Sequence, residues 1–515
     1  MSDRPAILVV RRGIDNVGVA VRDLEAGERV VCDDQGTSID AAEDMPAGHL
    51  IALCAIPPGQ SVIEYGQPVA MSRGCRAGEW ITQDRIENRL PAATHVPCSA
   101  VVDVDPLPAD QIPTFEGFRR SDGRVGTRNH VVVCPTSMCA SHQAMRIAAL
   151  AESAPCFANK YPHVDGVVAL PHDKGCGCSD GDNIEVLART LANMVDHPNV
   201  AGAIVIDLGC EKTNLQVFYG IVGRRLDTLG KPVEAISIQD IGGTAAAVRR
   251  GLEVMPHLLA DAEKQRRVTC PAGDLVLATE CGGSDGFSGL SGNPALGHCA
   301  DLVVRCGGAV ILSEVTEICG AEQLLTRRCR TPELADRVLA FSQWFERLAG
   351  MFGQSANMNP SPGNKAGGLV NITQKSLGAV AKAGTTPVED VLDYAEKVRT
   401  RGLTLMQSPG NDPESLGGMV AGGATVCGFT TGRGTTLGNA ICPVIKIASN
   451  TPMFERMADD MDVNAGTIID GTETVDQVGQ RIFDRVLSVA GGERSASERL
   501  GHREFGIWAC DRISL

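Results

Sequence analysis

The sequence predicts an α/β protein: a small N-terminal β-rich domain followed by two α/β units with mostly parallel sheets. Three observations support this prediction. The chain has 515 residues, more than one hydrophobic core usually organises. Its first 90 residues hold short apolar runs separated by turn residues. From residue 114 onward, short β-branched runs alternate with Ala- and Leu-rich helical stretches, the pattern of βαβ units around a parallel sheet.

The N-terminal domain is expected to cover residues 1–90. Strands are predicted within residues 6–10, 17–21 and 50–56, because Gly- and Pro-containing turns separate these apolar runs. A proline-rich stretch at residues 91–113 is predicted to be a linker.

The first α/β unit is expected at residues 114–269 and the second, which we predict to be catalytic, at residues 270–515. In the first unit we predict strands at residues 131–134, 164–170, 200–208 and 233–238, with helices at 140–152 and 185–194. In the second we predict strands at residues 275–279, 309–312, 403–407, 424–430 and 443–448, and a helix at 475–490.

Composition excludes several classes of partner. A net charge of −15 disfavours binding to nucleic acid or an anionic membrane, and 4% aromatic residues offer few stacking platforms for bases. The sequence shows neither a signal peptide nor an apolar run long enough for a membrane helix, and its 19 cysteines do not resemble a disulfide framework. We therefore expect a cytoplasmic protein that binds no nucleic acid and no membrane. A small anionic substrate remains compatible, since a cationic pocket can sit inside an acidic protein.

Ligands of open α/β sheets bind beyond the carboxyl ends of the strands, so the residues that follow each predicted strand are candidates for the site. These residues are His172, Cys176, Cys210, Glu211, Glu280, Cys281, Glu314 and Glu317. Thiolate, imidazole and carboxylate groups together form the ligand set of an iron or zinc site. We expect His172, Cys176, Cys210, Glu211 and Cys281 to hold a metal in one pocket. A three-cysteine iron–sulfur cluster stays open, as does the alternative that these cysteines are small buried hydrophobes.

Two glycine-rich segments are candidates for binding a substrate carboxylate. Residues 432–438 do not fit the dinucleotide fingerprint, and residues 364–368 lack the spacing of a P-loop. Each segment nevertheless combines backbone N–H groups with a cation, Arg433 in the first and Lys365 in the second.

Seven stretches together resemble the altronate/galactarate dehydratase family. They are residues 117–129 (GFRRSDGRVGTRN), 209–211 (GCE), 279–293 (TECGGSDGFSGLSGN), 313–322 (SEVTEICGAE), 359–368 (NPSPGNKAGG), 429–435 (FTTGRGT) and 462–466 (DVNAG). The family also carries an N-terminal module of the SAF type, which fits residues 1–90 as a SAF-like domain. The segment around His49 (PAGHLIAL) resembles a GHK-like stretch of that module.

The resemblance implies an iron-dependent hydro-lyase that converts an altronate- or galactarate-like sugar acid to a 2-keto-3-deoxy acid. Ferrous iron (Fe2+) is the implied cofactor, with an iron–sulfur cluster or another divalent metal as alternatives. The implied catalytic residues are His49, Glu280, Glu314 and Glu317. The residues expected to bind substrate are Arg128, Asn129, Ser284, Asp285, Asn293, Asn364, Lys365, Thr431 and Arg433. One departure is that residues 78–84 carry no histidine, whereas many relatives have a His-rich end to this module.

Other functions remain open from sequence alone. The family includes sulfolactate lyases, so the leaving group could differ. An iron–sulfur or thiol redox protein is a second class, although the sequence offers only a CxC pair at Cys176 and Cys178. A sensor that binds sugar acids through the SAF-like domain is a third. A homodimer is also left open.

Overall fold

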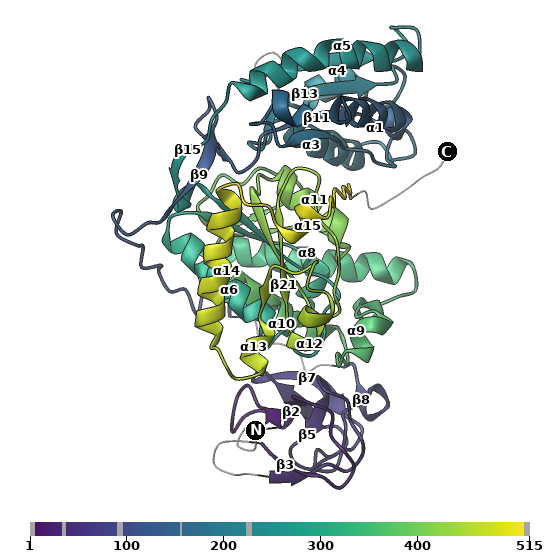
Figure 1. Ribbon diagram of the computed structural model, residues 1–515. Coiled ribbons are helices and arrows are strands. Elements are labelled where there is room, and N and C mark those ends of the chain that lie inside the picture. The colour runs from purple at the N-terminus through teal and green to yellow at the C-terminus, as the bar shows by residue number, and fades with distance from the viewer. Residues whose placement is uncertain (1–5, 33–37, 90–95, 155–156, 223–228, 509–515) are drawn as a thin grey trace.

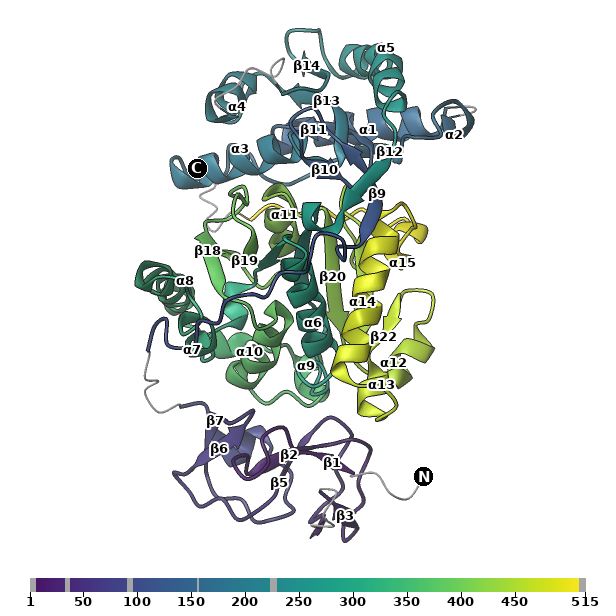
Figure 2. The same ribbon diagram turned by 90° about the vertical axis from the view of Figure 1, so that its left-hand side faces the viewer.

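The computed structural model describes residues 6–32, 38–89, 96–154, 157–222 and 229–508. Three bodies lie in a row, with the N-terminal β domain at one end, a large α/β domain in the middle and a small α/β domain at the other end (Figures 1 and 2). The predicted fold class is confirmed. The order in space differs from the order in sequence, because the middle body is built from the C-terminal half of the chain.

The β domain consists of short antiparallel strands. They are β1 (Ile7–Leu8), β2 (Val17–Ala20), β3 (Arg29–Val31), β4 (Ser38–Asp40), β5 (Leu50–Ala52), β6 (Ser61–Glu64), β7 (Gln67–Ser72) and β8 (Ile86–Glu87). They form the sheets β1-β2-β5, β3-β4 and β6-β7-β8. The run predicted at residues 50–56 is strand only as far as Ala52, because the Pro57-Pro58 turn soon follows.

The predicted linker lies along the large domain. Residues 91–95 fall outside the described residues, but the rest is anchored: the Cys98 N–H donates to Thr326 O at 3.1 Å, and the Leu107 N–H donates to Arg305 O at 2.9 Å. A small antiparallel sheet of β10 (Val125–Gly126), β9 (Thr114–Arg119) and β15 (Val268–Pro271) follows. This sheet was not predicted. Because β9 precedes the small α/β domain and β15 follows it, the small domain is an insertion between these two paired strands.

The small α/β domain has a four-stranded parallel sheet in the order β12-β11-β13-β14. Its elements are β11 (His130–Pro135), α1 (Met138–Glu152), α2 (Phe157–Lys160), β12 (Gly166–Ala169), α3 (Asp182–Val195), β13 (Val200–Asp207), α4 (Leu215–Val222), β14 (Val233–Ser237) and α5 (Thr244–Glu263). Helices α1 and α5 cover one face of the sheet, and α3 and α4 cover the other. The β-branched runs produce strands that are buried on both faces, as parallel sheets require.

The large domain has a seven-stranded parallel sheet in the order β18-β19-β17-β16-β20-β21-β22. Its strands are β16 (Val276–Cys281), β17 (Ala309–Leu312), β18 (Val388–Leu392), β19 (Gly402–Met406), β20 (Val426–Thr431), β21 (Val444–Ala448) and β22 (Val463–Asn464). Helices α6 (Gly292–Arg305), α8 (Pro332–Met351) and α14 (Val475–Ala490) pack on one face, and α11 (Asp412–Ala421) packs on the face toward the small domain. The shorter helices are α7 (Glu322–Thr326), α9 (Pro362–Ala366), α10 (Ile372–Val380), α12 (Thr451–Arg456), α13 (Gly466–Ile469) and α15 (Ala496–Arg499).

The two ends of the large sheet face different neighbours. At the amino end of β20, Thr127 Oγ1 beside the small domain donates to Thr425 O at 2.6 Å. At the opposite end, the loops that follow the strands meet the β domain, where Asn371 Nδ2 donates to Val69 O at 2.8 Å. The β domain therefore covers the edge at which α/β sheets bind ligands. None of the helices in the described part of the chain has the length and apolar composition needed to cross a membrane.

Candidate active site

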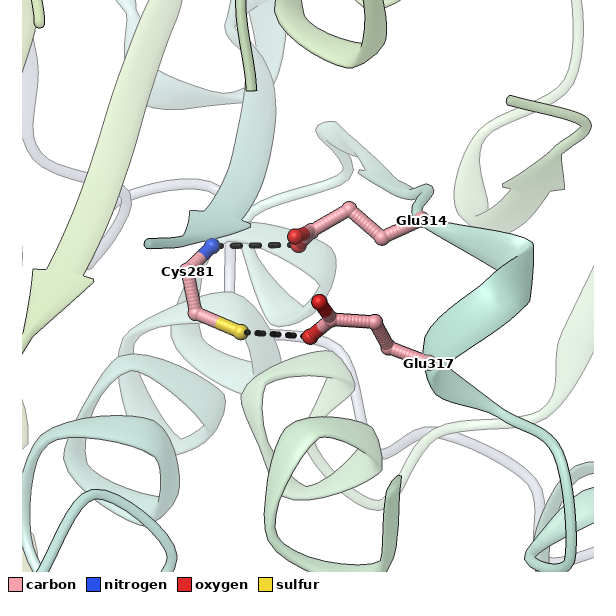
Figure 3. A group of neighbouring side chains, drawn as sticks. All are labelled: Cys281, Glu314 and Glu317. Carbon is pink, nitrogen blue, oxygen red and sulfur yellow. Dashed lines mark hydrogen bonds between the residues drawn. The ribbon is translucent and has the colours of Figure 1, made fainter. Parts of the chain in front are cut away.

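A group of buried charged residues lies at the carboxyl ends of β16 and β17. Glu280 and Cys281 end β16, while Glu314 and Glu317 follow β17, and the two strands are neighbours in parallel register. Figure 3 shows that Glu314 and Glu317 both point toward Cys281. Lysines from α10 and from η6 (Ala381–Ala383), and the first residue of α11, complete the group. We call it the buried charge cluster: Glu280, Cys281, Glu314, Glu317, Lys375, Lys382 and Asp412.

Two lysine–glutamate ion pairs are sealed inside this cluster. Lys375 Nζ lies 2.5 Å from Glu317 Oε1, which also accepts a hydrogen bond from Asn359 Nδ2 at 3.1 Å. Lys382 Nζ pairs with Glu314 Oε2 and lies 3.0 Å from Cys281 Sγ. The side chain of each charged partner is at most 7% exposed. Desolvating four charges is costly, so the fold maintains them here only because each has a partner of opposite sign.

The backbone is strained at Glu314. Its φ is +59°, in the left-handed region that residues other than glycine rarely adopt. Surrounding bonds hold it there: the Glu314 N–H donates to Ser408 Oγ at 2.8 Å, and its carboxylate accepts from the Cys281 N–H at 3.0 Å. Such strain concentrates at functional sites, because a precisely aimed side chain can require it.

The carboxyl groups of the cluster differ in pKa. Burial, together with the negative charges of Glu314 and Asp412, raises the pKa of Glu280 well above its usual range. Burial by itself would also raise the pKa of Glu317, but the charges of Lys375 and Lys382 and the hydrogen bonds from Lys375 and Asn359 together outweigh it and lower that pKa. Burial raises the pKa of Asp412 to about 7. Carboxyls with separated pKa values can divide the roles of acid and base.

The cluster contains two groups of side chains that could hold a metal ion. One is Cys281, Glu314 and Glu317, and the other is Glu280, Glu314 and Asp412; within each group the ligand atoms lie within 4.8 Å of one another. The lysine ammonium groups already occupy the first group. In the second, Glu280 Oε1 and Glu314 Oε1 are buried and meet no N–H or hydroxyl donor among the described residues, although the two carboxyl groups can share a proton with each other. This all-oxygen set fits a hard divalent cation.

The loops predicted to bind substrate converge beside this site. Lys365 in α9 is half-buried and Arg433 is exposed, and a Cβ placed on Gly367 would lie 3.3 Å from Arg433 Cδ. The Ser284 hydroxyl is buried and has no hydrogen-bond partner within the described chain. Asn364 is buried in α9, next to Lys365. These four residues remain candidates for holding a substrate.

The β domain places His49 against these loops. Its ring is 7% exposed, Nε2 lies 3.4 Å from Ala366 O, and burial lowers the pKa of the imidazole, so the ring is neutral at physiological pH. A Cβ on Gly286 would lie 1.9 Å from Gly48 O, so only glycine permits this close docking. Trp80, from the segment that lacks histidine, packs edge-on against His49 with ring centroids 4.8 Å apart.

Arg128 and Asn129 were predicted to bind substrate, but the structure assigns them to the scaffold. The Arg128 guanidinium is buried, pairs with Glu498 through two contacts of 2.6 and 2.7 Å, and donates to three backbone carbonyls of residues 127, 489 and 493. Asn129 Nδ2 donates to His163 O and Ala262 O. The GFRRSDGRVGTRN stretch therefore ties the small domain to the end of the chain, because its polar groups are already satisfied.

Three more residues predicted to bind substrate instead hold the loops in place. Asn293 Nδ2 donates to Gly378 O at 3.0 Å, and Thr431 Oγ1 accepts from the N–H groups of residues 434 and 435. Asp285 accepts hydrogen bonds from Ser288, Ser449 and Asn450. These side chains shape the walls of the site, but their bonding capacity is used within the protein.

The five residues expected to share one metal pocket lie on two sheets, and the structure does not gather them into one group. His172, Cys176, Cys210 and Glu211 follow β12 and β13 of the small domain, whereas Cys281 ends β16 of the large one. Among the described residues, the groups whose ligand atoms lie within 4.8 Å include Cys281 but none of the other four. The loop after β12 does touch the large domain, where Lys174 Nζ lies 4.0 Å from Glu414 Oε1 of α11.

Sequence reasoning missed Lys375, Lys382 and Asp412. The lysines lie on a segment that is buried from Ile372 to Ala383 apart from Ala381. Its only charged residues are Lys375 and Lys382, and fully buried lysines are rare unless they are paired. A cleft of about 400 Å³ lies between the two α/β domains, lined by residues that include Arg124, Lys397 and Thr425. It opens at the amino ends of the large sheet, away from the buried charge cluster.

Comparisons with known proteins match almost the whole chain. Residues 7–89 match the altronate/galactarate dehydratase SAF domain, residues 117–263 the D-galactarate dehydratase/altronate hydrolase second domain, and residues 272–512 the D-galactarate/altronate dehydratase C-terminal domain. Galactarate dehydratase (L-threo-forming) of Escherichia coli (strain K12) is 37% identical, over 96% of this chain and 95% of that protein. Altronate dehydratase of Bacillus subtilis (strain 168) is 33% identical, over 96% and 97%. The (2R)-sulfolactate sulfo-lyase subunit beta of Chromohalobacter salexigens is 32% identical, over 76% and 96%.

Proposed function

The chain belongs to the altronate/galactarate dehydratase family, and from this premise we propose that it removes water from a galactarate- or altronate-like sugar acid to yield a 2-keto-3-deoxy acid. We place the reaction at the buried charge cluster. The observation that carries the proposal is the pairing of two buried ammonium groups with carboxyls of separated pKa, beneath loops that offer Lys365 and Arg433 to a substrate carboxylate.

The chemical difficulty of this reaction is charge. Dehydration takes the proton from C2, beside a carboxylate that is already negative, and expels hydroxide from C3. A second negative charge therefore develops in the transition state, and preorganised cations stabilise it best in a site that excludes water. Lys375 and Lys382 supply two such cations at fixed positions. The product enol then becomes the ketone without a redox step.

The protonation states suggest how the proton moves. Asp412 is half-buried and its pKa is about 7, so it suits the general base that accepts the C2 proton. The raised pKa of Glu280 suits the acid that protonates the departing hydroxyl. His49 and the β domain close the site from the other side and limit access of water.

Ferrous iron, or another divalent cation, would be held by Glu280, Glu314 and Asp412. When bound there, a cation supplies Lewis-acid polarisation of the substrate carboxylate and hydroxyl groups. A cation bound there would replace the proton that Glu280 and Glu314 can share, and would meet the two buried oxygens that accept from no N–H or hydroxyl group in the described chain. In that form Glu280 and Asp412 act as ligands, and the neutral imidazole of His49 is the proton acceptor that remains in the wall of the site.

The test is a screen of C5 and C6 sugar acids, with sulfolactate included, for 2-keto acid formation under anaerobic conditions. Each substrate is assayed with added Fe2+ and again after chelation. We expect turnover of a galactarate- or altronate-like acid, and its loss on chelation if the cation-bound form is the active one. Turnover of sulfolactate alone, or of none of the acids, would overturn the proposal.

A further inference from the structure

The small α/β domain gathers exposed cysteines at one edge of its sheet. Of the 17 cysteines that the structure describes, four are exposed: Cys54, Cys139, Cys176 and Cys210. Free cysteines are normally among the most buried residues, so exposed ones are informative. Three of the four follow the adjacent strands β11, β12 and β13 at their carboxyl ends. We propose that Cys139, Cys176 and Cys210 together hold an iron–sulfur cluster, at a site separate from the buried charge cluster.

The three loops share one frame. Strand β11 lies between β12 and β13, so the segment that carries Cys139 is flanked by the other two. The Met138 N–H donates to Lys174 O at 2.8 Å, which joins this segment to the loop of Cys176. Thr136 Oγ1 donates to Glu211 Oε1 at 2.8 Å, which joins it to the loop of Cys210. Neighbouring parallel strands are about 4.8 Å apart, so thiols from three of them can converge on one small object.

His172 belongs to the frame of this edge and is not available as a ligand. Its Nδ1 accepts a hydrogen bond from the Lys174 N–H at 3.2 Å, so the ring proton is on Nε2, which lies 3.0 Å from Pro135 O. Both nitrogens are therefore used. Burial lowers the pKa of this histidine to about 4, so it stays neutral in that arrangement.

Glu211 is also committed to the frame. Its Oε1 accepts from the Leu208 N–H at 2.9 Å as well as from Thr136, and its Oε2 accepts from the Gly209 N–H at 2.8 Å. The carboxylate thus fastens the turn after β13 to the end of β11. With His172 and Glu211 occupied by protein donors and acceptors, the exposed thiols are the soft ligands that this edge offers to a metal.

Several glycines near this edge face open space. A Cβ placed on Gly177, on Gly181 or on Gly243 would meet no described atom within 4 Å. Gln239 Nε2 donates to Cys210 Sγ at 3.4 Å, and hydrogen bonds to sulfur are one of the ways in which proteins tune iron–sulfur centres. Lys212 Nζ, 3.1 Å from Cys178 O, adds positive charge next to the Cys176 loop.

The spacing of the three thiols argues against a single tetrahedral ion. Thiolates that share one tetrahedral ion at about 2.3 Å lie roughly 3.8 Å apart. Among the described residues, this trio is not one of the groups whose ligand atoms all lie within 4.8 Å. In a cluster each thiolate binds a different iron, so the three sulfur atoms can lie farther apart than they do around one ion. Iron and sulfide come from solution, each thiol releases its proton on binding, and the iron without a cysteine remains open to an exogenous ligand.

The test is anaerobic reconstitution of the full chain with Fe2+ and sulfide, followed by measurement of bound iron, acid-labile sulfide and visible absorption. We expect about four iron and about four sulfide per chain. Cys139→Ser, Cys176→Ser and Cys210→Ser should each lose most of both. Cys54→Ser, which changes an exposed cysteine elsewhere, and Cys281→Ser, which changes the thiol of the buried charge cluster, should load like the parent. Circular dichroism checks that every variant is folded.

Three results would overturn this proposal: a parent protein that takes up no sulfide, one iron bound per chain without sulfide, or loading that depends on Cys281 rather than on Cys139. The readout is independent of turnover. A protein that loads the cluster but dehydrates no sugar acid would support this site and refute the proposed function. A protein that dehydrates a sugar acid but loads no cluster would support the proposed function and refute this site.

Discussion

Replacing Lys382 with methionine tests whether the buried ammonium groups act in chemistry or only in folding. The side chain is 1% exposed and its Nζ contacts both Glu314 and Cys281 Sγ. Lys382→Met removes the charge at nearly constant volume and leaves Glu314 buried without its partner. We expect the free energy of unfolding to fall by about 3–5 kcal/mol, the cost of breaking a buried ion pair from one side.

Catalysis should fall for a different reason. If Lys382 faces charge that develops in the transition state, its loss removes stabilisation that the ground state does not need, and kcat should fall about 10²–10³-fold. The double variant Lys382→Met/Glu314→Gln separates the two effects, because it removes both charges. Its stability should return to within roughly 1.5 kcal/mol of the parent, since no unpaired charge remains, while its kcat should stay low.

Stability is measured by urea unfolding and activity by steady-state 2-keto acid formation on the best substrate. The Glu314→Gln single variant completes the cycle and reports any role of Glu314 itself. A double variant with parental kcat/KM would refute the reasoning, because it would show that the Lys382–Glu314 pair serves only the fold.

Three further predictions follow from the same structure. Lys365→Ala should lower kcat/KM by roughly one to three orders of magnitude, about 1.5–4 kcal/mol, and Lys365→Arg should restore it only partly. Near-parental kinetics of Lys365→Ala would show that residues 359–368 are a structural loop. Arg128→Met should lower the free energy of unfolding by about 3–5 kcal/mol, because it leaves the Glu498 carboxylate without its partner. The KM of the protein that remains folded should not change. A raised KM would show that Arg128 does contact the substrate. Burial raises the pKa of Glu64 to about 8, so the folded protein keeps a proton that the unfolded chain releases above pH ~4.5. The free energy of unfolding should therefore fall, by on the order of 4 kcal/mol, as pH rises from about 5 to about 9, and Glu64→Gln should flatten that slope in urea titrations; an unchanged slope would contradict the assigned burial effect.

Much of the fold could be predicted from local pattern. The helix expected at residues 475–490 has those bounds, because Thr474 and Gln477 form a capping box at its start and one face of it is apolar. The strands at residues 131–134 and 309–312 were found because parallel strands buried on both faces appear as continuous β-branched runs. The convergence of Glu280 with Glu314 and Glu317 followed from the same reasoning, since neighbouring parallel strands end at one edge.

The sequence pattern already divided the strands between two units, but it did not predict what physically separates the two sheets. Cys176 and Cys281 each follow an apolar strand, one in each unit. The division comes from β9 and β15, which pair with each other across the whole small domain and exclude it from the large sheet. Pairing between segments so distant in sequence depends on the complete packing of the chain.

The roles of individual polar side chains were likewise set by three-dimensional contacts. Arg128 and His172 lie in stretches typical of a functional site, yet the side chain of each forms its hydrogen bonds with other groups of the protein. Lys382 stands in an apolar helix and shows its role only through the carboxylate it meets there. The sequence by itself therefore determined the helices and strands, and the sheet edges at which candidate catalytic and metal-binding residues lie. Which groups face each other across those edges depends on the packing of helices and loops from distant parts of the chain. The physical reason is that a charged side chain can be buried only where the fold brings a partner of opposite charge to it.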